Sequence, residues 1–247
     1  MKRKFIWKIL IYFIIYSIIG FFLETIYAIF TKGMLESRQS FLYGPFCIVY
    51  GVGAICLILA LKEYRNNNIK LFFYGMILGA TIEYFSSYIP EIILHVKWWD
   101  YSNDFLNIHG RTCLYYAVMW GILTIPLINH INPFFDKYID KFLQYNSRSV
   151  LKFCTIAITL FMIFDGVLTC YALNNFLVRV SGEYNINING INNSEADENY
   201  LAEAFSNEKM MMTYPNIIVV NDRNENILLE SVLSDVKNYY YRFGIAK

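Results

Sequence analysis

The chain has 247 residues, of which 56% are hydrophobic, 18% aromatic and only 17% charged, and its mean hydropathy is +0.35. This composition is too apolar for a soluble domain of this size, and it indicates an integral membrane protein embedded in a lipid bilayer. The net charge of +1 excludes the basic field that nucleic-acid binding requires.

The apolar runs are long enough to predict several membrane spans. The first follows a basic start, MKRK, and has no small-residue cleavage site, so it is predicted to be an uncleaved span rather than a signal peptide. A span needs about 20 mostly apolar residues. Five segments qualify: 5–30, 41–61, 69–94, 111–131 and 151–173. The predicted fold is therefore an all-α membrane protein with a five-helix transmembrane bundle over residues 1–173.

Lysine and arginine in the short connections set the expected orientation. With the N-terminus in the cytoplasm, eleven of these residues lie on the inner side and four on the outer side, so a cytoplasmic N-terminus is favoured. The inner connections, 62–70 and 132–150, are short and basic and show no obvious coupling helix. Five spans then place residues 174–247 outside the cell membrane.

This C-terminal tail is predicted to be a small extracytoplasmic segment of α/β character. Residues 174–190, NNFLVRVSGEYNINING, are typical of a loop, and residues 194–212 resemble a serine-capped amphipathic helix. Residues 215–244 contain a short strand, a turn and a second helix. The apolar pieces are too few for an independent core, so the tail is expected to fold against the outer face of the bundle.

Glu83 lies near the centre of the third predicted span. Gly75 and Gly79 precede it at intervals of four residues, so the three share one helical face on which another helix can approach closely. A carboxyl at this depth costs several kcal/mol unless it faces other helices, water or a partner. Glu83 is therefore predicted to point into the bundle, either lining a cavity for binding or translocation or serving as a hydrogen-bonded packing element.

Two further acids lie in predicted spans. Glu24 follows Ser17 and Gly20 on one face of the first span, and it either lines the same cavity as Glu83 or reaches headgroup water. Asp165 lies near the middle of the fifth span, with Thr169 one turn further along the same face. A buried carboxyl tends to be neutral unless it meets a cation. The partner expected for a charged acid is Arg111, a bound cation or a cationic substrate.

The polar stretch WWDYSNDFLNIHGR, residues 98–111, separates the third and fourth predicted spans. Its tryptophans and tyrosine are typical of the aromatic belt at a membrane surface, but its charged and amide side chains exceed what a belt requires. The stretch is predicted to fold back over the outer end of the bundle, with Asp100 paired to Arg111. It is either a functional cap or a packed structural one.

Several short motifs in the sequence resemble those of the bacterial family known as "putative ABC-transporter type IV": YSIIGFFLETIY, FLYGPFCIVYG, TIEYFSSYIPE, WWDYS and N-x-x-GR-x-CL. They cover about residues 12–120 in the family's order. The resemblance implies an integral membrane protein with a role in transport. It places the family's polar and small-residue signature on Glu24, Arg38, Gly44, Pro45, Tyr50, Gly51, Glu83, Trp99, Asp100, Tyr101, Gly110 and Arg111.

The function expected is that of a transporter or a transport-related permease subunit, in which Glu24, Glu83, Asp100, Tyr101, Arg111 and Asp165 form a polar cavity. No G-x-x-x-x-G-K-[ST] occurs, so any ATPase would be a separate subunit. A homo-oligomer is left open. The five cysteines and three histidines lack ligand spacing, and no metal site, cofactor or catalytic residue is predicted.

Two alternatives are a non-catalytic scaffold or sensor with a partner-binding tail, and a membrane-embedded enzyme acting on lipid or envelope precursors.

Overall fold

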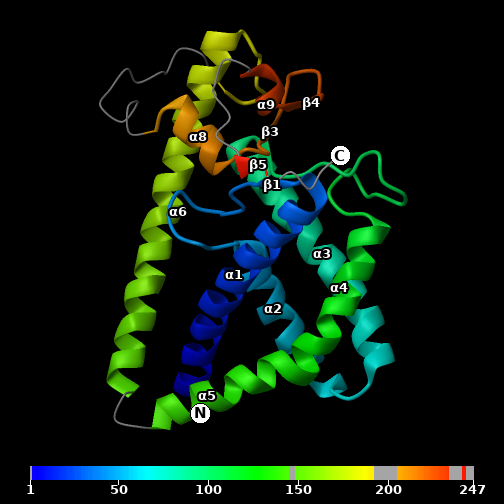
Figure 1. Cartoon of the computed structure of the whole chain (residues 1–247), viewed down its shortest axis with the longest axis vertical. Coiled ribbons are helices and arrows are strands. Elements are labelled where there is room, and N and C mark those ends of the chain that lie inside the picture. The colour runs from blue at the N-terminus through cyan, green and yellow to red at the C-terminus, as the bar shows by residue number, and fades with distance from the viewer. Residues whose placement is uncertain (1, 145–147, 192–204, 234–240, 243–247) are drawn as a thin grey trace. The chain divides into compact units, whose positions relative to one another are not determined.

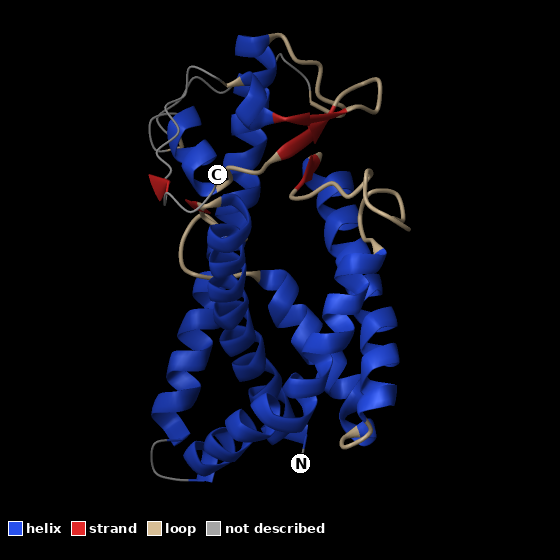
Figure 2. Ribbon diagram, turned by 45° about the vertical axis from the view of Figure 1, so that its right-hand side comes forward, coloured by secondary structure: helices blue, strands red, loops and turns tan. Residues whose placement is uncertain are grey.

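The computed structural model describes residues 2–144, 148–191, 205–233 and 241–242. It is mostly helical, with a few short strands (Figure 2). Its long helices are α1 (Lys2–Lys32), α2 (Ile48–Leu61), α3 (Asn68–Leu94), α4 (Leu114–Pro126), α5 (Asn132–Gln144) and α6 (Arg148–Tyr184). A π-helical turn, Leu127–Ile131, joins α4 to α5, and a 3₁₀ turn, Lys62–Tyr64, follows α2. Figure 1 shows the elements in chain order by colour.

Within the described residues, three helical stretches are long and apolar enough to cross a membrane: Lys4–Lys32, Leu114–Gln144 and Ser149–Tyr184. Helix α3 has sufficient length, but Glu83 and the surrounding tyrosines and serines make it less apolar. The structure thus supports a helical membrane protein, and the count of five spans stays a prediction.

The second predicted span, 41–61, is helical only from Ile48 onward. Gly44 adopts a φ of 76°, which favours glycine, and Pro45 lacks the backbone N–H that would extend a helix upstream. The remaining helix of 14 residues is about 21 Å long. That is shorter than the hydrocarbon core of a bilayer, which is about 30 Å thick. The helix therefore begins later than the predicted span, and the bounds of the span itself stay a prediction.

Two other segments are more helical than the sequence indicated. Residues 174–184 are the end of helix α6 rather than a loop, because Phe176, Leu177 and Val180 bury one face of it. The connection 132–150, predicted to be an inner one with no obvious coupling helix, contains the amphipathic helix α5. In both segments polar residues obscured the helical spacing of the apolar ones.

The chain divides into two compact units. The first comprises residues 1–20, 46–85 and 101–164. Its core is formed by the N-terminal half of α1 with α2, the first part of α3, α4 and α5. The buried side chains are Ile11, Tyr12, Tyr16, Ala54, Leu57, Ile58, Leu61, Leu71, Trp120, Leu127, Ile128, Ile139 and Leu143.

Glycines allow α3 and α4 to approach closely in this unit. A Cβ on Gly79 would lie 2.3 Å from the Cβ of Trp120, and one on Gly75 would lie 2.3 Å from Oγ1 of Thr124. The prediction that the glycine face of the third span receives another helix is confirmed, and that helix is α4.

The second unit comprises residues 21–45, 86–100 and 165–247. Strand β2 (Val96–Lys97) pairs antiparallel with β3 (Ile218–Val220), and β3 pairs with β4 (Asn226–Leu228). Val96 is opposite Val219, which is opposite Ile227. Strand β1 (Met34–Leu35) pairs with β5 (Tyr241–Arg242). The short helices are α8 (Asn207–Thr213) and α9 (Leu229–Val232).

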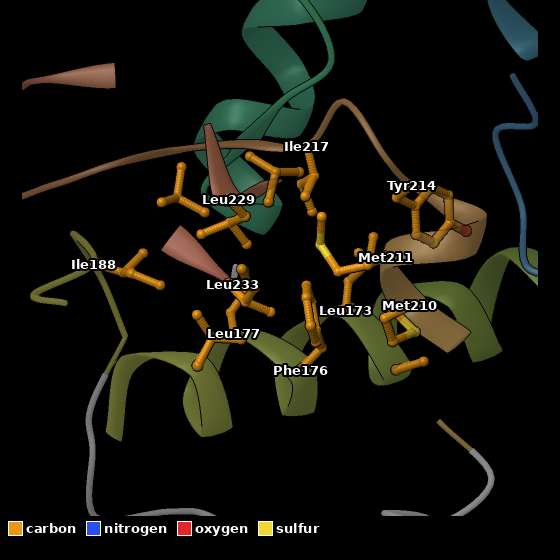
Figure 3. Close-up of a cluster of buried hydrophobic side chains, with 14 of the residues drawn as sticks. Leu173, Phe176, Leu177, Ile188, Met210, Met211, Tyr214, Ile217, Leu229 and Leu233 are labelled. Carbon is orange, nitrogen blue, oxygen red and sulfur yellow. The ribbon is translucent and has the colours of Figure 1, made fainter. Parts of the chain in front are cut away.

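The core of this unit forms where the tail packs on the last part of α6 (Figure 3). Leu173, Phe176 and Leu177 of α6 face apolar residues that come from the tail: Met210, Met211, Tyr214, Ile217, Leu229 and Leu233. Of the buried residues of this core, Val96, Ala172 and Leu173 precede residue 174 and the others lie within 174–247, so the expectation that the tail lacks an independent core stays a prediction. Helix α8 is capped by Ser206, whereas most of the amphipathic helix predicted over 194–212 lies outside the described residues.

Candidate functional site

Glu83 is the centre of a buried polar cluster in the first unit. Its residue is 6% exposed, and its carboxylate accepts two hydrogen bonds from the segment that precedes α4. Oγ1 of Thr112 donates to Oε2 at 2.7 Å, and the hydroxyl of Tyr101 donates to Oε1 at 3.4 Å. The prediction that Glu83 points inward is confirmed. Two of its partners in this cluster are hydroxyl groups, which donate to a carboxylate without adding charge.

The segment that carries these hydroxyls is held by its own hydrogen bonds. The side-chain nitrogen of Asn107 donates to the carbonyl oxygens of Ser102 and Asp104, each at 3.0 Å, and its Oδ1 accepts from the backbone N–H of Gly110 at 3.1 Å. Gly110 has a φ of 66°, a conformation that favours glycine. The N–H of Tyr101 donates to the carbonyl of Gly110 at 2.8 Å. The N-x-x-G spacing therefore closes a compact loop.

Arg111 and aromatic rings border the same cluster. The Arg111 guanidinium lies 5.5 Å from the ring centroid of Tyr84, a cation–π distance, and the Tyr84 hydroxyl lies 2.9 Å from Nδ1 of His109. Tyr101 stacks on Tyr116, with the ring centroids 4.4 Å apart. A cation, a carboxylate and three phenols thus occur within one loop and the two helices that flank it.

Sequence reasoning missed Thr112 and Tyr84 as parts of this cluster. Thr112 is the variable position of N-x-x-GR-x-CL, so the motif itself did not indicate it. Tyr84 adjoins Glu83 near the middle of the third predicted span, but it is not on the face selected by the four-residue spacing of Gly75, Gly79 and Glu83.

Asp165 anchors a loop in the second unit. It is fully buried, and its Oδ2 accepts from the backbone N–H of Tyr43 at 3.1 Å. Thr169, one turn along α6, accepts from the N–H of Leu42 at 2.9 Å. The FLYGP segment is therefore fixed to α6 by two side chains on one helical face. The shared face of Asp165 and Thr169 is confirmed, and backbone amides are the partners found for them.

A buried ion-pair cluster follows α1. Glu36 is 4% exposed and accepts from Arg38 at 2.7 Å and from Lys32 at 3.0 Å. Arg38 carries part of the family signature, and here it neutralises a carboxylate that sequence reasoning did not select. The alternation of charges in KGMLESR was the available signal.

Asp100 belongs to the second unit, where its Oδ2 accepts from the side-chain amide of Asn226 at 2.6 Å. Lys97 donates to the Oδ1 of the same Asn226 at 3.0 Å. Trp98 packs near Tyr214, with ring centroids 5.2 Å apart. The stretch WWDYS therefore changes unit between Asp100 and Tyr101, and the ion pair predicted between Asp100 and Arg111 stays a prediction.

The other selected residues fall into two groups. Tyr50 and Gly51 are packing positions: a Cβ on Gly20 would lie 2.3 Å from Cβ of Tyr50, and one on Gly51 would lie 2.2 Å from Oγ of Ser17. Glu24 is half-buried on the part of α1 that belongs to the second unit, and Trp99 also lies in that unit. Their contribution to a shared cavity with Glu83 stays a prediction.

Among the residues that the structure describes, no group of three or more His, Cys, Asp or Glu side chains could hold a metal ion. The groups with which the Glu83 cluster can bind a polar ligand are a carboxylate, a guanidinium and several hydroxyls.

Long apolar helices, close helix packing on glycines and buried carboxyls together define a helical integral membrane protein. The model of the family described as "Putative ABC-transporter type IV" matches residues 11–170, and the chain belongs to this family. Searches of curated proteins and of solved structures return no match. The chain is thus an ABC-transporter-related protein of the cell membrane.

Proposed function

We propose that the chain is the membrane-spanning permease subunit of a transporter and that Glu83 is a substrate-contacting group in its polar cavity. The observation that carries the proposal is the burial of the Glu83 carboxylate on a long helix, where it meets Thr112 and Tyr101. A carboxyl within a membrane protein is costly and is ordinarily retained for function. Hydroxyl partners can keep such a carboxylate charged and can be exchanged for those of a cationic or amine-bearing substrate.

The remaining predicted cavity residues extend this proposal. Arg111 and Tyr101 belong to the same unit as Glu83, and Asp100, Glu24 and Asp165 are assigned to the cavity because each is an acid in or beside an apolar run. In this arrangement the five predicted segments span the membrane, the N-terminus is cytoplasmic and residues 174–247 are extracytoplasmic. The excess of lysine and arginine in the connections supports that orientation.

We assign the energy source to a separate ATPase subunit. The sequence contains no phosphate-binding loop of the G-x-x-x-x-G-K-[ST] type, so the chain lacks the motif by which such subunits bind ATP. The family to which the chain belongs is consistent with this division of labour. The lipid bilayer is the other obligatory partner, and catalysis by the chain itself is not part of the proposal.

Affinity purification of the full chain from its native membrane in mild detergent tests the proposal. We expect an ATPase to co-purify with the wild type and with Glu83→Gln, and we expect the variant to lose the stimulation of ATP hydrolysis by transported substrate. Purification after chemical cross-linking in the membrane guards against loss of a weak partner. If no ATPase is recovered even after cross-linking, the permease assignment is wrong.

One observation favours a second function, that of a scaffold or sensor. The described part of the tail is folded, and its core includes Phe176 and Leu177 of α6, so an event at the tail could reach this helix. Removing residues 178–247 would delete most of this core and expose Phe176 and Leu177. A cleaner test inserts a protease site at the exposed turn 222–224 and asks whether cutting the folded tail abolishes function.

A further inference from the structure

A groove lies in the first unit between the N-terminal part of α1, the C-terminal end of α2 and α5. Its cavity volume is about 530 Å³. Small-molecule sites usually enclose about 300–1,000 Å³, so this groove is large enough for a ligand. It shares no residue with the Glu83 cluster, and the transport proposal leaves it unexplained.

Besides Lys8, three basic side chains line this groove: Lys62 and Arg65, which follow α2, and Lys137 of α5. All three are exposed. Within the described part of the chain, no carboxylate forms an ion pair with any of them. Their positive charge is therefore available to a ligand.

The acids of the groove are already neutralised. Lys8 lies 2.5 Å from Asp136 and 2.9 Å from Asp140, and Lys4 lies 2.7 Å from Asp140. The Tyr12 hydroxyl also donates to Asp136. Two lysines thus balance the two aspartates, and the groove as a whole is positive. An anion is the ligand that this charge favours.

The groove also has an apolar wall. Phe5 and Ile9 of α1 and Leu59 of α2 line it, and both Phe5 and Leu59 remain largely exposed. A water-soluble anion would leave these surfaces unused. A ligand with a phosphate at one end and a hydrocarbon chain at the other would cover both the basic and the apolar parts.

The exposed side chains of helix α5 favour a position of the groove at the level of the lipid headgroups. The chain turns at the π-helical segment Leu127–Ile131, and α5 then runs across the N-terminal end of α1 (Figure 1). Phe134, Tyr138 and Phe142 are exposed and recur every four residues, whereas Ile139 and Leu143 are buried. An exposed aromatic stripe next to lysines is typical of a helix lying in the membrane interface.

We propose that this groove binds an anionic glycerophospholipid. Lys62, Arg65 and Lys137 contact the headgroup phosphate, and one acyl chain lies along Phe5, Ile9 and Leu59. Basic pockets between helices on the cytoplasmic side are suited to such headgroups, and the predicted cytoplasmic N-terminus places the groove on that side. The proposal does not depend on transport or on an ATPase.

Native mass spectrometry of the delipidated full chain in neutral detergent tests the proposal. The probes are dioleoyl phosphatidylglycerol, dioleoyl phosphatidylcholine and inorganic phosphate. We expect saturable binding of phosphatidylglycerol at one site and weaker binding of phosphatidylcholine. The double variant Lys62→Gln/Lys137→Gln should weaken phosphatidylglycerol binding about fivefold for each charge removed.

Two control variants separate the site from general electrostatics and from misfolding. Lys70→Gln/Lys141→Gln removes two exposed lysines of the same unit that do not line the groove, and it should bind like the wild type. Lys62→Arg/Lys137→Arg keeps the charge and should retain binding. Equal weakening in both glutamine variants, equal binding of the two lipids, or displacement of phosphatidylglycerol by millimolar phosphate would overturn the proposal.

Discussion

Thr112 and Glu83, 29 positions apart in the chain, are joined by a 2.7 Å hydrogen bond between Oγ1 and a carboxylate oxygen, and both residues are buried. The bond ties the loop before α4 to the middle of α3. It therefore determines both the orientation of the carboxylate and the position of the loop above it.

Replacing Thr112 with valine should destabilise the protein by about 1–3 kcal/mol, because a buried carboxylate oxygen loses its donor while the side-chain shape is kept. Thr112→Ser should retain most of the stability. Thermal unfolding in detergent measures the difference. Thr81→Val is the control, because its hydroxyl bonds only to the carbonyl of Ile77 in its own helix and is exposed. Equal unfolding temperatures for the Thr112 and Thr81 variants would contradict the role given to this bond.

The contact between α3 and α4 leads to a second prediction. Gly79→Ala should destabilise the protein by about 1–3 kcal/mol, since the new methyl group would overlap the first carbon of the Trp120 side chain, which cannot rotate away. Gly182→Ala in α6 is the matched control: its Cβ meets nothing within 4 Å, and alanine is the better helix former by about 1 kcal/mol. The two variants should therefore shift the unfolding temperature in opposite directions.

The features that the sequence predicted correctly here depend on helical spacing. Gly75, Gly79 and Glu83 recur every four residues, so one close-packed face with an inward carboxyl followed from the period alone. The partner of that carboxyl did not follow. Thr112 reaches Glu83 because Asn107 and the left-handed Gly110 fold the loop back, and such loop conformations have no periodic signal.

Other predictions were limited because the residues that bury a segment lie far from it in the sequence. Phe176, Leu177 and Val180 were assigned to a loop because asparagines and Arg179 interrupt them. Several of the residues buried with them, among them Met210 and Leu229, lie more than 25 positions later in the chain. The structural roles of the motifs shared with the family could not be read from the sequence alone. The backbone N–H groups of Leu42 and Tyr43 in FLYGP donate to the side chains of Thr169 and Asp165, so this motif attaches the loop to α6.

The tail core gives a third prediction. Phe176→Ala should destabilise the second unit by about 3–5 kcal/mol, because it removes a fully buried ring from the core that also contains Met210 and Met211 of α8 and Leu229 of α9. Limited proteolysis should then cut within residues 205–233 at protease concentrations that leave the wild type intact. Phe153→Ala, on an exposed position of the same helix, should leave the digestion pattern unchanged.

The predicted orientation can be tested with reporter fusions. A fusion after Asn66 should be active in the cytoplasm, and one after Asp104 should be active outside, because the inner connections hold the larger share of lysine and arginine. A reversed pattern would move the Glu83 cluster to the cytoplasmic side.

The shared cavity leads to the last prediction, which concerns Glu24 and Glu83. If both acids line one polar cavity, cysteines placed at these two positions should form a disulfide under mild oxidation, since bonded cysteines have Cα atoms about 4.4–6.8 Å apart. Cys47, Cys56, Cys113, Cys154 and Cys170 are first replaced with serine or alanine so that the new pair reacts alone. A pair at Phe22 and Glu83 is the control, because Phe22 is exposed two positions away on α1 and should not cross-link. A Glu24–Glu83 pair that reacts no faster than this control would remove Glu24 from the cavity and leave Glu83 with the groups of its own unit.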